Sequence, residues 1–152
     1  MTTRRLLASG SLEQPTRRRS GMAMVEFVLI LPALIVILFG ILEFGGLFFQ
    51  WQTLSNAARE GAREAIVFRK NCDAGTVQTL IEQTVIDYAS AANIAVNTSD
   101  IAITGPCTGS GQPLRVEVSH DFGFQVLPGF ISQLTPTITL VGTSQMRNEG
   151  KS

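Results

Sequence analysis

The chain has 152 residues, of which 45% are hydrophobic, and its 12 basic side chains equal its 12 acidic ones in number. This length fits one small domain, and the zero net charge excludes a generally basic nucleic-acid binder and an acidic disordered chain. Two cysteines exclude a disulfide-dense miniprotein and a four-cysteine zinc module, and a single histidine, His120, excludes a metal site built from several histidines of one chain.

Residues 1–21 are basic, with five arginines against one glutamate and no apolar periodicity. They read as an unstructured leader. Taken alone, an arginine-rich start is also typical of a nucleic-acid-binding arm or an organellar transit peptide, and the segment that follows decides between these.

Residues 22–49 are nearly all apolar, and only Glu26 and Glu43 are charged. As a helix they would be about 42 Å long, whereas a bilayer core needs about 30 Å. The uncharged stretch 27–42 is a little short by itself, but it suffices if Glu26 lies at one interface and Glu43 near the other. We therefore expect a transmembrane helix over residues 22–49, with an interfacial belt at its far end formed by Phe44, Phe48, Phe49 and Trp51.

The arginines at 17–19 directly precede the apolar run, so the positive-inside rule places the N-terminus in the cytoplasm and residues 50–152 outside it. Cys72 and Cys107 would then lie in an oxidising compartment, where we expect them to pair. Such a disulfide closes a loop of 34 residues and contributes roughly 3–4 kcal/mol in the chain-entropy model. Two separate buried thiols are the alternative.

The helical pattern continues beyond the membrane, so we expect the first helix from about Ala23 to Arg69. Its stripe of mainly small residues permits close approach by another element. A second, amphipathic helix is expected over residues 76–93, with one face made of Val77, Leu80, Ile81, Val85 and Tyr88.

Beyond Ala95 apolar residues alternate with polar ones, as in half-buried strands, at Ile101/Ile103, Leu114/Val116/Val118 and Ile138/Leu140. Residues 105–111 read as a hairpin turn. Residues 122–134 fit a short amphipathic helix or a loop resting on the membrane, and they fit better a loop that covers the core. The expected fold is therefore α+β: a long N-terminal transmembrane helix that continues out of the membrane, a second packed helix and a small antiparallel sheet of about three strands.

The sharpest local feature is a glycine, Gly21, between the basic segment and the apolar helix, with Glu26 five positions later. A carboxylate at the end of a bilayer span is costly unless it has a partner. A peptidase that cuts after Gly21 would create an amino group at Met22, one helical turn from Glu26. The alternative is an uncut anchor in which Glu26 marks the membrane interface.

The region from Ser20 to Arg63 resembles the N-terminal region of the TadE-like family, pseudopilins of the tight-adherence (Tad, or Flp) type IV pilus assembly systems. The resemblance covers under a third of the chain and rests on several elements that keep their order: Gly21, Val25-Glu26-Phe27, Leu31-Pro32, Phe39-Gly40, Glu43-Phe44 and Asn56-Ala57-Ala58-Arg59-Glu60-Gly61-Ala62-Arg63.

The resemblance implies a pilin-like fold, cleavage by a prepilin peptidase between Gly21 and Met22, and Glu26 as the carboxylate used in subunit recognition and assembly. It also implies a structural part in pilus biogenesis and adherence at the bacterial cytoplasmic (inner) membrane. The implied partners are other pilin and pseudopilin subunits and the Tad assembly platform. Because residues 50–152 exceed the exported part of the short major Flp pilins, a minor subunit is expected. The runner-up is an uncleaved single-pass anchor whose exported domain binds a ligand or partner.

Pro32 and His120 each have an ordinary structural interpretation. Pro32 fits a helix kink or a tolerated membrane proline. His120 and Asp121 are the only His–acid neighbours, but adjacent strand residues point to opposite faces, which does not suit a hydrolase triad. We expect no enzyme, no cofactor, no metal and no nucleic-acid partner.

Overall fold

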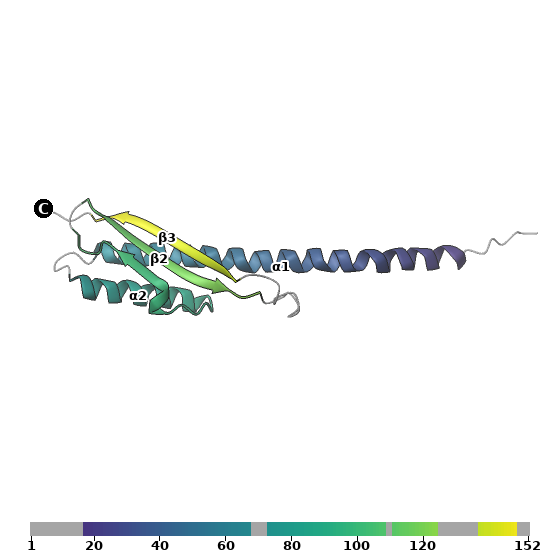
Figure 1. The fold of residues 1–152 in the computed structure, drawn as a ribbon, viewed down its shortest axis with the longest axis horizontal. Coiled ribbons are helices and arrows are strands. Elements are labelled where there is room, and N and C mark those ends of the chain that lie inside the picture. Colours follow the sequence, from purple (N-terminus) through teal and green to yellow (C-terminus); the bar gives the residue numbers. More distant parts are fainter. Residues whose placement is uncertain (1–16, 68–72, 109–110, 125–136, 149–152) are drawn as a thin grey trace, which may run out of the picture. The chain divides into compact units, whose positions relative to one another are not determined.

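The structure is a computed structural model that describes residues 17–67, 73–108, 111–124 and 137–148. Its elements are the helices α1 (Arg17–Val67) and α2 (Ala74–Ala91), the 3-10 turn η1 (Thr98–Asp100), and the strands β1 (Ile101–Thr104), β2 (Pro113–Phe122) and β3 (Ile138–Arg147) (Figure 1). Two compact units, Met1–Leu38 and Phe39–Ser152, divide the chain, and α1 contributes to both. The expected α+β class is confirmed.

Helix α1 corrects the predicted start of the first helix. It begins at Arg17, so residues 17–21 are helical and not unstructured, and the expected start near Ala23 is wrong. Apolar periodicity could not reveal this extension, because arginine and serine carry no such signal, although arginine is a good helix former. The helix is described as far as Val67, and the expected end at Arg69 lies among residues 68–72, outside the described part. Pro32 lies inside the helix and does not end it.

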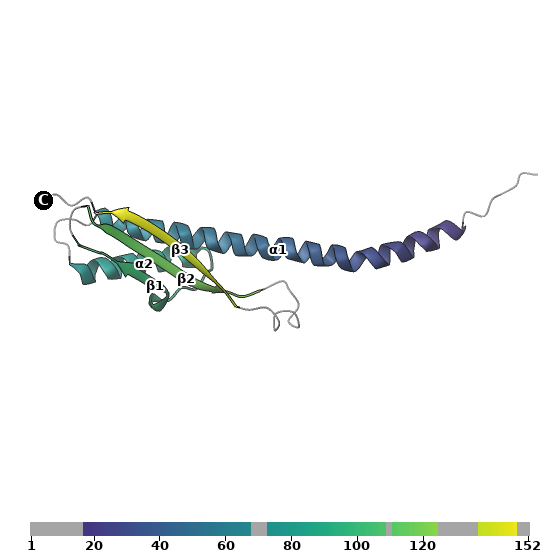
Figure 2. The same ribbon diagram turned by 45° about the horizontal axis from the view of Figure 1, so that its top comes forward.

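The three strands form an antiparallel sheet in the order β1-β2-β3, with β2 in the middle (Figure 2). The register pairs Ile101 with Val118 and Val116 with Ser144. Alternate residues of β2 (Leu114, Val116 and Val118) are fully buried, as the two-residue period requires. The expected strands are confirmed, but β2 and β3 each run to 10 residues and are longer than the apolar alternation indicated.

Helices α1 and α2 contribute to one core with the sheet in the second unit. A Cβ added to Gly61 of α1 would lie 2.8 Å from Val85 Cγ2 of α2, and one added to Gly142 of β3 would lie 2.5 Å from the carbonyl carbon of Leu54 in α1. The small residues of α1 therefore do permit close approach, and α2 is the element that approaches Gly61.

The buried face of α2 differs from the predicted one at its C-terminal end. Val77, Ile81, Val85 and Ala89 are buried, while Tyr88 is 41% exposed. The helix runs from Ala74 to Ala91, two residues earlier at each end than expected.

Asp73 caps α2. One carboxylate oxygen, Oδ2, accepts hydrogen bonds from the Thr76 hydroxyl (2.8 Å) and from the Thr76 backbone N–H (2.9 Å). These bonds, the hydroxyl first, lower the pKa of Asp73 below its ordinary 3.8, because they favour the ionised form.

The β1–β2 connection is the predicted hairpin. Gly105 and Gly111 both have φ near +82°, and a Cβ on Gly105 would lie 2.3 Å from the carbonyl oxygen of Pro113. Only glycine fits the close approach at Gly105. Of the stretch 122–134, only Phe122–Phe124 is described, with an edge-to-face contact between the two phenylalanine rings, and residues 125–136 lie outside the described part.

Candidate functional site

The predicted processing site lies in the first turns of α1. Gly21 is exposed, and a Cβ there would meet nothing within 4 Å. Met22 is 79% exposed, and Glu26 is exposed four residues further along. Because four residues make about one helical turn, Met22 and Glu26 lie on the same face of α1.

The apolar residues that follow are turned outward in the first unit. Large side chains from Phe27 to Leu38 are mostly exposed, including Phe27 at 59%. Helix α1 holds one stretch that is long and apolar enough to cross a membrane. Such a surface is stable in hydrocarbon and not in water, so the helix provides a membrane anchor.

Glu43 and Phe44 are neighbours in the sequence with opposite environments. Glu43 is 6% exposed and Phe44 is 75% exposed. Glu43 is the first residue of a buried stripe on α1. The stripe continues through the half-buried Leu47 and Gln50 to the fully buried Leu54. The sequence alone suggests that Glu43 marks the membrane interface. In the structure its side chain is buried, and its place relative to a membrane stays a prediction.

The segment from Asn56 to Arg63 divides between core and surface. Ala57, Ala58 and Gly61 are buried, whereas Arg59 and Arg63 are exposed. Arg59 donates a 3.2 Å hydrogen bond to Asn56, and the Arg63 guanidinium lies 3.6 Å from Glu60. The small residues thus pack the domain, and the exposed ion pair contributes little to stability.

The structure describes one of the two cysteines, Cys107. Cys107 is half-buried against the core, in the hairpin connection, with φ near +59°. Cys72 lies outside the described residues, so its pairing with Cys107 stays a prediction.

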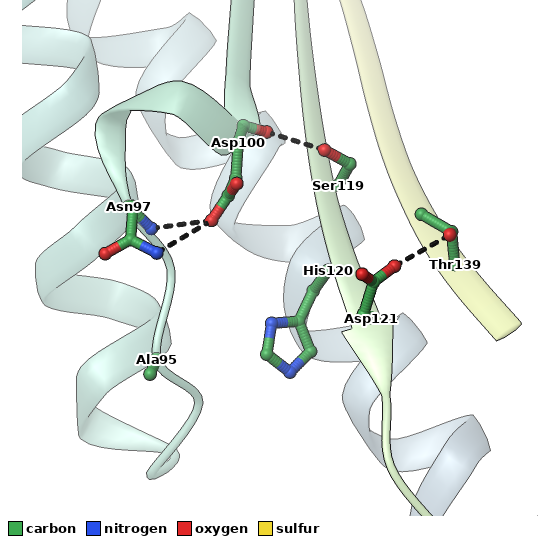
Figure 3. Close-up of a pocket in the computed structure, with 7 residues that line it drawn as sticks. All are labelled: Ala95, Asn97, Asp100, Ser119, His120, Asp121 and Thr139. Atoms are coloured by element: carbon green, nitrogen blue, oxygen red, sulfur yellow. Dashed lines mark hydrogen bonds between the residues drawn. The ribbon is translucent and has the colours of Figure 1, made fainter. Parts of the chain in front are cut away.

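A polar cavity of about 310 Å³ lies between η1 and the sheet (Figure 3). Asn97 donates its backbone N–H and its side-chain amide to Asp100, at 2.9 and 3.2 Å, and Ser119 donates its hydroxyl to the Asp100 carbonyl oxygen at 3.1 Å. The hydroxyl of Thr139 donates to Asp121 at 2.7 Å. Besides Ala95, the lining therefore consists of groups that mostly bind one another, together with His120.

These contacts limit the chemistry that the side chains of the cavity can carry out. The backbone N–H of Asn97 is the main cause that lowers the pKa of Asp100, and the field of His120 adds to it. Asp121 is bound to Thr139, and Figure 3 shows the imidazole of His120 turned away from that pair. The arrangement lacks the nucleophile–base–acid order of a hydrolase triad. Within the described ranges, no three His, Cys, Asp or Glu side chains gather closely enough to hold a metal ion.

Sequence reasoning missed this cavity. Asn97, Asp100 and Ser119 carry no motif, and their proximity depends on the pairing of β1 with β2. The capping relation of Asn97 and Asp100, three residues apart, is the one signal that could have revealed part of it.

The comparisons with known proteins bear on the long helix. Residues 21–63 match the model of the family described as TadE-like protein. Neither the curated proteins nor the solved structures gave a significant match. The matched segment begins at Gly21, contains the apolar anchor and ends at Arg63, and proteins with this domain are associated with Tad pili. Residues 21–63 of this chain are therefore similar to the TadE-like protein family, and the remainder of the chain lies outside the match.

Proposed function

We propose that the chain is a minor pseudopilin, a structural and non-enzymatic component in the assembly of a Tad (Flp) type IV pilus used for surface adherence. A prepilin peptidase at the cytoplasmic face of the inner membrane removes residues 1–21. The subunit then stays inserted by α1, with residues 50–152 outside the cytoplasm. Other pilin and pseudopilin subunits and the Tad assembly platform are its partners.

The observation that carries this proposal is the position of the TadE-like match. It begins at Gly21, the residue before the proposed cut. Gly21 would be the last residue of the removed leader, and the exposed Met22 would be the new N-terminus. Glu26 provides a carboxylate one turn after Met22.

Cleavage changes the charge at this end of α1. Removal of the leader takes away five arginines and leaves a new ammonium group at Met22. Glu26, on the same face, is its nearest acidic neighbour in the sequence. This carboxylate neutralises the ammonium group of its own chain or of a neighbouring subunit, which lowers the cost of burying either charge between apolar helices. The apolar surface of residues 27–42 packs against the helices of those subunits.

The exported part needs a stable fold to provide contacts in the assembly. A disulfide between Cys72 and Cys107 would tie the α1–α2 connection to the β1–β2 hairpin. Loop closure of this length in an oxidising compartment stabilises a small domain.

The test is the N-terminus of the membrane-bound chain. N-terminal sequencing should read from Met22, and Gly21→Val should leave the full-length precursor. The matched control is Gly45→Val, because Gly45 lies in the same helix and a Cβ there also meets nothing within 4 Å. Loss of processing in both variants, or an intact leader in the unmodified chain, would contradict the proposal.

The alternative is an uncleaved single-pass protein whose exported domain binds a ligand. The cavity beside His120 is the observation that favours it. Under this alternative, the exported domain should keep its binding when fused to an unrelated anchor, and His120→Ala should abolish it. Under the pseudopilin proposal, His120→Ala should leave pilus assembly unchanged.

A further inference from the structure

Strand β3 lies at the margin of the sheet, and β2 is its hydrogen-bonded neighbour (Figure 2). Natural proteins usually protect such an edge with charges, a proline, a bulge or a short strand. Strand β3 has none of these features along its length: it has 10 residues and no proline, its pairing with β2 is continuous, and Arg147 at the last position is its one charged residue. The edge is therefore a template for a further strand.

The bonds of Asn148 show which backbone groups of β3 point out of the sheet. Its N–H donates to the carbonyl oxygen of Gln112 (2.9 Å), and its own carbonyl oxygen accepts from the N–H of Gly111 (2.7 Å), so both groups are turned to the β2 side. In an antiparallel pair this direction alternates from residue to residue. Pro113, which has no N–H, agrees with the alternation because it stands opposite Arg147. The odd-numbered residues of β3 therefore direct N–H and C=O away from β2: Thr139, Val141, Thr143 and Gln145.

These outward groups are accessible. All four side chains are exposed, and Val141 is 47% exposed. Within the described residues, no hydrogen bond joins the outward N–H and C=O groups to another part of the chain. They recur every second residue, which is the spacing that an incoming strand requires.

A second copy of this chain does not fit the edge. Figure 1 shows β3 running in the same direction as the part of α1 that belongs to the same unit. Antiparallel pairing of two β3 strands would reverse α1 between the copies, so two anchors could not enter one membrane from the same side. Parallel pairing would turn one sheet over and place its buried face beside the exposed face of the other. Strand β1 is too short to cover β3, because it has four residues and the N–H of Ile101 is already bonded to Thr98.

The charges along the edge define the chemistry of the partner. Residues 138–146 include no charged side chain, and the exposed Arg147 has no ion pair within the described residues. A partner segment that complements this edge is extended and uncharged opposite residues 139–145, and it places a carboxylate beside Arg147.

We propose that β3 accepts a strand from a different polypeptide, whose extended, uncharged segment continues the sheet and whose carboxylate pairs with Arg147. The source of this strand is another subunit of the assembly, and that part of the inference rests on the proposed function. The binding capacity of the edge does not depend on it.

A synthetic peptide tests the edge directly. Valine and threonine alternate in this peptide, and a glutamate at its N-terminus would meet Arg147 in antiparallel pairing. The peptide is added to the full chain in micelles, and amide hydrogen exchange is read residue by residue. The four outward amides should exchange rapidly in the free chain and slowly with the peptide, whereas the even-numbered amides of β3 should be slow in both. An absence of protection at the outward amides would overturn the inference.

Thr143→Pro and Thr143→Ala are a matched pair of variants. Proline removes the outward N–H of residue 143 and no bond to β2, whereas alanine keeps that N–H. Proline should weaken peptide binding about tenfold, and alanine should leave it nearly unchanged. Slow exchange of the even-numbered amides checks that the variants fold, and Gln145→Pro takes the place of Thr143→Pro if that variant unfolds. Equal binding by the proline and alanine variants would overturn the inference.

The carboxylate is tested separately. Arg147→Ala should weaken binding of the peptide about threefold, and it should not affect a peptide that carries glutamine in place of the glutamate. Equal effects on the two peptides would contradict the pairing with Arg147.

The source of the strand is tested in cells that assemble the pilus. Thr143→Pro should be processed after Gly21 like the unmodified chain, and it should be incorporated into pili less than Thr143→Ala. Equal incorporation of the two variants would overturn the inference that a subunit strand occupies the edge. Absence of the unmodified chain from pili would instead contradict the proposed function.

Discussion

Gly142, in the middle of β3, lies close to the backbone of α1, and its replacement by alanine should be strongly destabilising. The added Cβ would lie 2.5 Å from the carbonyl carbon of Leu54 and 2.6 Å from both the Leu54 oxygen and the Ser55 nitrogen. All three are backbone atoms of α1, so no side-chain rotation can relieve the overlap.

The size of the effect follows from this geometry. Ordinary contacts of a Cβ begin near 3.4 Å, so β3 and α1 must separate by about 0.9 Å. Overpacking of a core costs about 1–3 kcal/mol, and contact with rigid backbone favours the upper end of that range. In a domain of 60–100 residues, each kcal/mol lowers the unfolding midpoint by about 4–8 °C.

Hydrogen exchange of the full chain in micelles, read by mass spectrometry, measures the effect locally. The amides of β3, and those of the α1 turn around Leu54, should exchange faster in Gly142→Ala. Gly45→Ala is the control, because its Cβ meets nothing within 4 Å.

Gly61→Ala should give a smaller loss than Gly142→Ala. Its Cβ meets the Cγ2 methyl groups of Val85 and Ile81, at 2.8 and 3.1 Å, and these side chains can shift. Alanine also gains up to about 1 kcal/mol in helix propensity.

Unchanged exchange in Gly142→Ala would refute the close approach of β3 to α1.

Three further changes test other parts of the account. Glu26→Ala should leave cleavage intact and reduce incorporation into pili, measured by fractionating sheared fibres; normal incorporation would contradict the charge pairing. Asp73→Asn should destabilise the protein at neutral pH, because the lowered pKa of Asp73 gives stability that is present above the ordinary value of 3.8 and lost as the pH falls through the folded value. Urea unfolding should therefore show a gap between the two proteins that closes in acid, and a constant gap would disprove the linkage. A reductant should lower the thermal midpoint of the native chain but not that of Cys72→Ser, and equal shifts would argue against the disulfide.

The membrane helix and the class of fold could be predicted because their signals are long and strong. A run of 28 residues that are nearly all apolar admits few structures, and the change of period after Ala95 separates helix from strand. The start of α1 at Arg17 was missed because a helix can extend into residues that have no apolar pattern.

The inward-facing residues of β3 and the buried face of α2 depend on tertiary packing. Gly142 and Ser144 occupy inward positions of β3, where the alternation would require apolar residues. A glycine fits there because α1 comes so close, and no sequence pattern names the approaching element. On α2 the small Ala89 is buried and Tyr88 is 41% exposed, because the buried face continues at a spacing of four residues from Val85.

The candidate site divides in the same way. Gly21, Met22 and Glu26 are close in sequence, so helical geometry alone places Met22 and Glu26 on one face. The burial of Glu43 and the cavity beside His120 follow from the folded structure, and the cavity is lined by residues that are far apart in the chain. They become visible only when the folded unit is assembled.

The intact mass of the chain shows whether processing occurs after Gly21. The protein is extracted from membranes of cells that contain a Tad prepilin peptidase and of otherwise identical cells that lack it. We expect a mass reduced by that of residues 1–21 in the first cells and the full mass in the second. The full mass in both would contradict it.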